Sequence, residues 1–262
     1  MIAELIIIYI FIFIFGAVFG SFFNVCISRI PLKESLLTES HCPNCGKAIK
    51  YHNNIPIFSW LFLKGKCSDC GQPISITYFL VELITPLLFM FIFYVNGSRF
   101  SITFFSQIIF ASFAIIIAFI DLKNQIIPDV LSIPLLFIGL IFGFLQNNIN
   151  GLFESFIGGA TGFLLFLIVS EFYSKVRKKE ALGGGDIKIM AAIGAFSGWM
   201  GVLAITFLAS VFALIILVMV KHDPEKHFPF GPFLVSASLF YLIGGRFLEN
   251  LYMKFFDFIM TI

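Results

Sequence analysis

Long apolar runs separated by short polar segments dominate the pattern along this chain of 262 residues. A helix needs about 20 predominantly apolar residues to cross the hydrocarbon core of a bilayer. Runs of roughly that length recur along the whole chain, and they predict about eight membrane-spanning helices. The predicted spans are approximately 5–26, 78–95, 102–120, 131–146, 152–173, 187–199, 201–220 and 232–248. The pattern therefore predicts an all-α, polytopic membrane protein.

The division between the sixth and seventh spans is the weakest part of this pattern. Residues 187–220 form one nearly continuous apolar run. Ser197, Gly198 and Gly201 offer a turn in its middle, which favours two short helices. One long, tilted helix is the alternative, and it would move the loop at 221–229 and the C-terminus to the other side of the membrane.

Lysine and arginine are distributed unevenly over the polar segments. With eight spans, 14 of these residues fall on one side of the membrane and three on the other. Positive charge concentrates in the cytoplasmic loops of membrane proteins. We therefore expect both termini outside and the loop at 30–77 in the cytoplasm. With seven spans the loop at 221–229 and the C-terminus exchange sides and a strong bias remains, so charge alone favours eight spans at most weakly.

The loop at 30–77 is the one sizeable polar segment, and it divides the chain. Residues 1–29 hold the first span, and residues 78–262 hold the others. The first span has no basic segment before it and no small-residue cleavage site, so we expect a retained helix and not a signal peptide. The predicted organisation is a first helix, a small cytoplasmic loop domain at 30–77, and a membrane-embedded core.

The composition narrows the class of function. Hydrophobic residues make up 59% of the chain and charged residues only 12%, whereas about a quarter of the residues of a soluble domain are charged. So little charge excludes a conventional cytosolic enzyme, a nucleic-acid-binding protein and a disordered protein. The lipid bilayer is the expected surrounding.

Four of the five cysteines form two Cys-x-x-Cys pairs in the polar loop, at Cys42, Cys45, Cys67 and Cys70. A glycine follows each pair and lets the backbone turn toward the sulfur atoms. Cytoplasmic thiols stay reduced, so this pattern predicts a tetrahedral zinc site, although the 21-residue spacer is slightly longer than usual. Four thiolates leave no open coordination position, which makes the expected role of the zinc structural.

Two alternatives to this zinc site stay open. The cysteine pairs are also compatible with redox motifs or labile disulfides, although the pattern favours a metal. Separately, a metal site in which His41 or His52 replaces one cysteine ligand is possible but less favoured, since these histidines flank the first pair.

Acidic residues at the ends of apolar runs are the candidates for chemistry, because charged groups at a membrane are costly. Asp121 closes the third span, and Asp186 follows three glycines, 183–185, at the start of the sixth. The predicted topology places both near the cytoplasmic face. Two carboxyl groups held together there would share a proton, which is how aspartic proteases activate water. The glycines would let an extended substrate approach the backbone.

Structural ion pairs explain these two acids equally well from spacing alone, with Lys123 and Lys188 as natural partners. Asp129 is interpreted as an acid at the start of the fourth span, where it would stabilise the helix N-terminus. Glu82, about one turn inside the second span, is a candidate to pair with a lysine of the polar loop.

Taken together, these motifs closely resemble the type IV prepilin peptidase family. Residues 121–129 are similar to the first aspartate motif of that family, and residues 183–188 to its Gly-x-Gly-Asp motif. The similarity runs in order over nearly the whole chain, which one motif would not do by accident. Its other segments are 16–31, the two cysteine pairs, the residues around Glu82, and 229–233.

The resemblance implies a bifunctional enzyme of a bacterial cytoplasmic membrane, with its active site facing the cytoplasm. Such an enzyme cleaves the short basic leader of prepilin-like precursors, in pilus, secretion or competence systems, after a glycine. It then N-methylates the new N-terminal residue with S-adenosylmethionine. Prepilin-like proteins are the implied partners.

The resemblance also implies roles for particular residues. Asp121 and Asp186 take the catalytic positions, and the four cysteines take the zinc positions. Gly183, Gly184, Gly185 and Lys188 are expected to position the substrate. Glu82 and Asn24 are candidates for the methyltransferase half, for which no glycine-rich methyl-donor fingerprint is present.

Two other classes of function compete with this interpretation. An ion- or proton-coupled membrane transporter would also place acids in the membrane, although the chain shows no inverted repeat. A zinc-anchored assembly protein without activity would explain the cysteines but leave the aspartate motifs unexplained.

Overall fold

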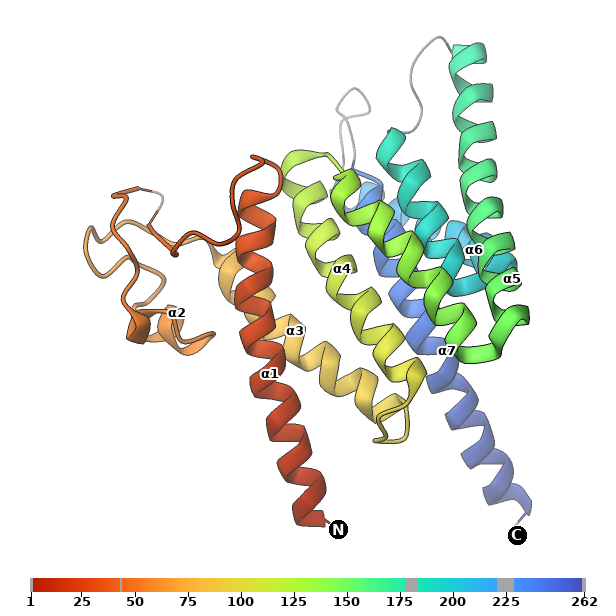
Figure 1. The fold of residues 1–262 in the computed structure, drawn as a ribbon, viewed down its shortest axis with the longest axis horizontal. Helices are drawn as coiled ribbons and strands as arrows, with labels where there is room; N and C mark the ends of the chain where they lie inside the picture. Colours follow the sequence, from red (N-terminus) through yellow and green to blue (C-terminus); the bar gives the residue numbers. More distant parts are fainter. Residues whose placement is uncertain (1, 43, 178–182, 221–228, 261–262) are drawn as a thin grey trace. The chain divides into compact units, whose positions relative to one another are not determined.

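The computed structural model describes residues 2–42, 44–177, 183–220 and 229–260 (Figure 1). Within these residues the chain is helical and forms no strand, which confirms the all-α class. The elements in chain order are α1 (Ile2–Arg29), the 3₁₀ turn η1 (Tyr51–Asn53), α2 (Phe58–Phe62), α3 (Ile76–Val95), α4 (Ile102–Asn124), α5 (Asp129–Arg177), α6 (Gly184–Val220) and α7 (Gly231–Met260).

Five helices, α1 and α3 to α6, are long and apolar enough to cross a membrane, and α7 adds the shorter apolar stretch Gly231–Gly245. The 49 residues of α5 would extend about 70 Å as one straight helix, far more than the hydrocarbon core of about 30 Å. The helix is broken at Asn147 and Asn148, and Figure 1 shows the second arm turning back from the end of the first. Because α6 is also broken, the described helices and their arms occupy the positions of all eight predicted spans.

The break in α6 resolves the ambiguity of residues 187–220. It lies at Gly198, which has φ 70° and ψ 175°. Residues with a Cβ rarely adopt such a conformation, so a glycine is needed at this point. The two-helix interpretation is therefore confirmed. Four lysines of the charge comparison, at 178, 179, 221 and 226, lie outside the described residues.

The chain divides into two compact units, residues 1–93 and 94–262. In the first unit, α1 and α3 approach closely because α1 carries glycines on the contacting face. A Cβ at Gly16 would lie 2.5 Å from the Cα of Pro86, and one at Gly20 would lie 2.9 Å from the Cα of Glu82. The polar loop is anchored at both ends by this helix pair. The predicted boundaries after residues 29 and 77 both fall inside this unit.

In the second unit, the second arm of α5 crosses the first arm of α6 in close contact, and glycines lie at the crossing point. A Cβ at Gly158 would overlap the carbonyl oxygen of Gly194, and the reverse also holds. One turn along, a Cβ at Gly162 would overlap the Met190 carbonyl oxygen. Membrane helices gain little from burying apolar surface against each other, so such close backbone packing is what holds them together.

We expect Gly158→Ala to destabilise the protein by about 1–3 kcal/mol, because the added methyl group must push the α5 and α6 backbones apart. The matched control is Gly245→Ala, since nothing lies within 4 Å of a Cβ at that helical position. Thermal unfolding of the purified proteins in detergent, followed by tryptophan fluorescence, compares the two. Equal melting temperatures would contradict the importance of this crossing.

Candidate active site and metal centre

Asp121 lies in the last turn of α4, with a residue exposure of 5%. The next turn ends the helix, because Gln125 adopts the left-handed conformation with φ 55° and donates its N–H to the Asp121 carbonyl oxygen at 2.9 Å. The carboxyl group is therefore held in a buried position at the end of a membrane helix.

Asp186 lies in the first turn of α6, directly after the three glycines, and is half-buried. Its Oδ2 accepts a hydrogen bond from the N–H of Gly183 at 3.2 Å. Its own N–H donates to the Gly183 carbonyl oxygen at 3.0 Å. These two bonds fix the carboxylate against the loop that precedes the helix.

Gly231 and Ile127 connect the surroundings of the two aspartates. A Cβ at Gly231 would lie 2.6 Å from Oδ2 of Asp121 and 2.9 Å from Cδ1 of Ile127. A Cβ at Gly185 would lie 2.8 Å from Cβ of Ile127. The buried Asp121 carboxyl group, the start of α7, Ile127 and the residue before Asp186 thus form one continuous contact. Residues separated by more than 100 positions in the sequence meet at the ends of three helices.

The sequence patterns pointed to neither Ile127 nor a specific role for Gly231. In the sequence, Gly231 stands out only as part of the segment Pro-Phe-Gly-Pro, which resembles a family motif. Ile127 carries no signal, because one isoleucine among many looks like any other apolar residue.

Of the three glycines, only Gly185 is packed so closely against a described residue that a side chain would not fit. It lies against Ile127, whereas Gly184 is exposed and has nothing within 4 Å of a Cβ. With respect to the described residues, the backbone at Gly184 is therefore open on its outer side, next to the Asp186 carboxylate.

Lys188 forms an ion pair with Asp129, the first residue of α5. Its Nζ lies 2.7 and 2.8 Å from the two carboxylate oxygens. The side chains are 42% and 56% exposed, so the pair adds little stability. Its geometric effect is to join the start of α5 to the first turns of α6, two residues from Asp186. Asp129 therefore links α5 to α6 through Lys188, in addition to its position at the N-terminus of α5.

The four cysteines of the polar loop gather into one group in the first unit. All four Sγ atoms lie within 4.8 Å of one another, and those of Cys42 and Cys70 are 3.9 Å apart. Zn–S bonds of about 2.3 Å in a tetrahedral site place sulfur atoms about 3.8 Å apart. The donor set therefore fits a thiophilic metal ion. His41 instead directs its Nδ1 to the carbonyl oxygen of Glu39, at 3.2 Å.

The two cysteine pairs are built in the same way, 25 residues apart. In the first pair, the Cys42 N–H donates to the Lys47 carbonyl oxygen and the Gly46 N–H donates to the Cys42 carbonyl oxygen, both at 2.9 Å. Gly46 has φ 70° and its counterpart Gly71 has φ 69°, so each turn needs its glycine. The equivalent bonds of the second pair, at 2.9 and 3.0 Å, run from Cys67 to Gln72 and from Gly71 to Cys67.

The surroundings of the sulfur atoms suit a metal ion electrostatically. The backbone N–H groups of Cys45 and Asn44 hydrogen-bond the Cys42 sulfur and lower the pKa of Cys42 to about 7. At Cys70 the N–H of Gln72 has the same effect, but desolvation and the three neighbouring sulfurs outweigh it and raise the pKa to about 11. Crowded thiolates repel one another, and a divalent cation relieves that repulsion.

Glu82 ties the polar loop to α3, and Asn24 ties α1 to α3. Glu82 Oε2 accepts a hydrogen bond from the N–H of Ile57 at 2.7 Å, in place of the lysine partner considered above. Ile57 has φ 69° and precedes α2. Asn24 on α1 donates from Nδ2 to the carbonyl oxygen of Tyr78 on α3 at 2.9 Å. Both side chains are thus engaged in holding the first unit together.

Two family models match this chain. The Bacterial Peptidase A24 N-terminal domain matches residues 14–96, which hold most of α1, the cysteine group and α3. The Type IV leader peptidase family matches residues 108–218, which hold both aspartates. The interval between the two matches, residues 97–107, follows closely after the boundary between the compact units.

Curated relatives named prepilin leader peptidase/N-methyltransferase are similar over most of the chain. The protein of Pectobacterium carotovorum subsp. carotovorum is 32% identical over 260 residues, covering 88% of this chain and 91% of the relative. The Klebsiella pneumoniae protein is 38% identical over 207 residues, covering 76% and 90%. The Myxococcus xanthus protein is 36% identical over 203 residues, covering 77% of this chain and 60% of the relative. No solved structure was found to match. By these matches, the chain belongs to the type IV leader peptidase family.

Proposed function

We propose that this protein cleaves the leader of prepilin-like precursors, with Asp121 and Asp186 as its catalytic pair. The observation that carries the proposal is the continuous contact from the Asp121 carboxyl group through Gly231 and Ile127 to Gly185. It joins the helix ends that bear the two acids, within the segment that the leader peptidase family model matches. None of the matched families and relatives reported above is a transporter.

The proposed reaction is hydrolysis of one peptide bond by a pair of carboxyl groups that share a proton. The ionised carboxyl group removes a proton from water as the water oxygen attacks the scissile carbonyl carbon, and the protonated one donates to the carbonyl oxygen. When the C–N bond breaks, the leaving amine takes the proton that came from water, and the hydroxyl formed on the carbonyl oxygen returns its proton to the pair as the C=O bond re-forms. The pair then again holds one proton, so it is ready for another cycle.

Substrate positioning in this proposal uses the open backbone at Gly184 and the Lys188–Asp129 ion pair. An extended substrate has access to the exposed backbone of Gly184, whereas both backbone groups of Gly183 bond to Asp186 and hold its carboxylate beside that backbone. Lys188 acts indirectly, since its bond to Asp129 fixes the α6 turn that carries Asp186. The apolar helix of the precursor would pack among the membrane helices, with its basic leader at the cytoplasmic face.

We also propose that the protein lies in the cytoplasmic membrane, with both aspartates at the cytoplasmic face. The apolar helices describe a multi-pass membrane protein, as expected for this family. The uneven distribution of lysine and arginine supports a cytoplasmic location for the polar loop and for the membrane face that carries both aspartates.

Zinc and S-adenosylmethionine are the proposed cofactors. Zinc would be held by Cys42, Cys45, Cys67 and Cys70, and would cross-link a loop that has little core of its own. N-methylation of the new terminus by S-adenosylmethionine is supported by the names of the relatives. Glu82 and Asn24 are the candidates near that chemistry, but their described bonds go to Ile57 and Tyr78, so no transfer step is assigned to them.

We expect Asp121→Asn and Asp186→Asn each to reduce cleavage by about 10²–10⁴-fold, because an amide cannot take part in the proton exchange. The measurement is mass spectrometry of a prepilin-like peptide incubated with the purified full-length protein and S-adenosylmethionine. A methyl group on the new N-terminus is read in the same spectrum. Glu171→Gln, which removes an exposed carboxylate of α5, is the control. Normal cleavage by either aspartate variant, with the protein folded, would refute the catalytic pair.

Gly231→Ala tests whether the contact beside Asp121 matters for catalysis. Its Cβ would lie 2.6 Å from the carboxyl oxygen, so the carboxyl group must move. We expect cleavage to fall at least about tenfold through kcat, since a small misplacement of a catalytic group is costly. Gly244→Ala on the same helix makes only ordinary contacts and should cleave normally. Unchanged kcat in Gly231→Ala would show that the contact has no catalytic importance.

Cys45→Ser and Cys70→Ser are expected to abolish zinc binding and to expose the 30–77 loop to trypsin. Metal analysis of the purified wild-type protein should give about one zinc per chain, as one tetrahedral four-thiolate site requires. Cys26→Ala, outside the cysteine group, should keep its zinc and its resistant loop. A wild-type protein without metal but with a resistant loop would overturn the structural role of zinc.

A further inference from the structure

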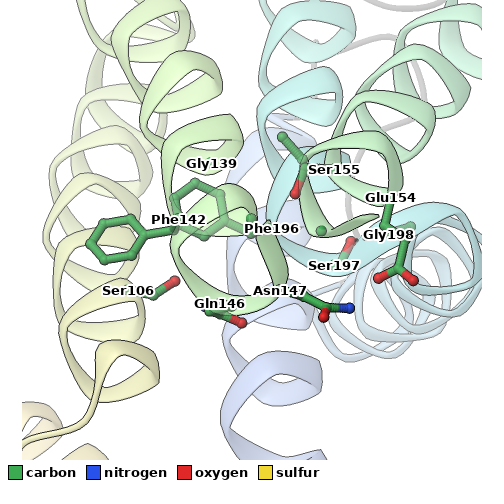
Figure 2. A pocket seen from close by; sticks show the side chains of 13 residues that line it. Ser106, Gly139, Phe142, Gln146, Asn147, Glu154, Ser155, Phe196, Ser197 and Gly198 are labelled. Carbon is green, nitrogen blue, oxygen red and sulfur yellow. Dashed lines mark hydrogen bonds between the residues drawn. The ribbon is translucent and has the colours of Figure 1, made fainter. Parts of the chain in front are cut away.

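A polar cavity of about 180 Å³ lies where α5 and α6 are broken, within the second unit (Figure 2). Its walls come from α4, from both arms of α5, and from the break in α6. Figure 2 shows hydroxyl, amide and carboxylate groups arranged around this space. The polar side chains that line it belong to Ser106, Gln146, Asn147, Glu154, Ser155 and Ser197.

This cavity lies at the membrane face opposite to the candidate active site. Ser106 precedes Asp121 by 15 residues on α4, which places them about 22 Å apart along the helix axis. Gln146 lies at the far end of the first arm of α5, whose start carries Asp129. Along α6, Gly198 at the break is similarly remote from Asp186. The cavity is therefore separate from the proposed catalytic pair.

Two buried serines face the cavity without a protein partner. Ser106 and Ser155 are 5% and 6% exposed, and neither forms a hydrogen bond with any of the residues that the structure describes. Serines in helices usually donate back to a carbonyl oxygen one turn earlier, as Ser112 does to Ile108 at 2.8 Å. No described polar side-chain atom is both enclosed by protein and unpartnered, so these two hydroxyl groups open into the cavity.

The charge and hydrogen-bonding groups of the lining residues indicate which class of ligand the cavity would bind. It offers one carboxylate, from Glu154, together with hydroxyl and amide oxygens that accept hydrogen bonds. None of the residues lining this described cavity is a lysine, arginine or histidine. The rings of Phe142 and Phe196 complete the wall, and aromatic faces attract cations. Such a lining suits a positively charged group that donates several hydrogen bonds.

We propose that this cavity binds a primary ammonium group. An ammonium has three N–H donors, for which the Glu154 carboxylate offers a charged acceptor and the hydroxyl and amide oxygens of the lining offer neutral ones. At about 30 Å³ per water molecule, the volume has room for a group of the size of ethanolamine. At a membrane surface the ammonium comes either from the head group of phosphatidylethanolamine or from a free small amine. The proposal does not depend on the peptidase activity.

Native mass spectrometry of the full-length protein in detergent tests this proposal. Dioleoyl phosphatidylethanolamine, phosphatidylcholine and phosphatidylglycerol are titrated separately, because only the first has a primary ammonium. We expect the wild type to bind phosphatidylethanolamine at least about tenfold more tightly than phosphatidylcholine, the effect of a charge-assisted hydrogen bond. Glu154→Gln should lose that preference, whereas Glu171→Gln, the same change elsewhere on α5, should keep it.

A matched pair of serine variants tests the buried hydroxyl groups. Ser106→Ala should weaken phosphatidylethanolamine binding by about threefold, as expected for one neutral hydrogen bond. Ser112→Ala on the same helix should not, because its hydroxyl is already bonded within the helix. Both changes are small, so both proteins should fold.

Competition with free ethanolamine then separates the two sources of the ammonium. Displacement of the lipid by millimolar ethanolamine would assign the site to the ammonium alone, and retention of the lipid would assign it to the intact head group. Equal binding of the three lipids by the wild type, with no binding of ethanolamine, would overturn the proposal. An unchanged preference in Glu154→Gln would overturn it as well.

Discussion

Close approach of helix backbones at glycines is the interaction on which the rest of this structure depends. In lipid, apolar side chains gain little by leaving one apolar surrounding for another, so helices are held by how closely they fit. Gly16 and Gly20 set the fit of α1 on α3, and Gly158 and Gly194 set that of α5 on α6. The same constraint reaches the candidate active site, because Gly185 and Gly231 let three helix ends converge beside Asp121. A structure held in this way tolerates very few added atoms at those positions.

Helix ends explain why the candidate chemistry lies where it does. Within the hydrocarbon core a helix satisfies its own backbone groups, so free N–H and carbonyl groups exist only at its ends and breaks. Asp186 uses one such end, where it accepts from Gly183, and Asp121 lies one turn before another. The cavity at the far face is built on two breaks, at Asn147–Asn148 and at Gly198. Polar functions in this protein therefore follow the interruptions of its helices.

Much of the fold could be predicted because hydropathy responds directly to the bilayer. The apolar runs gave the spans, and Gly198 marked the break within 187–220 because its conformation excludes a side chain. The cysteine group was predictable for a similar reason, since two equal turns of fixed geometry leave a fixed spacing in the sequence. The partners of individual polar groups were not predictable. Lys188 meets Asp129, 59 residues away, and Glu82 meets a backbone N–H, because helix packing rather than local spacing decides which groups face each other.

The polar groups of the two compact units are held in place in different ways. In the first, order comes from the cysteine group and from the bonds of Glu82 and Asn24, all outside or at the edge of the apolar spans. In the second, order comes mainly from helix packing, and the carboxyl groups are held at the ends of the packed helices. Loss of metal should therefore disorder the first kind of structure without directly loosening the second. If the proposed peptidase and methyltransferase chemistries reside in different units, they should respond separately to zinc.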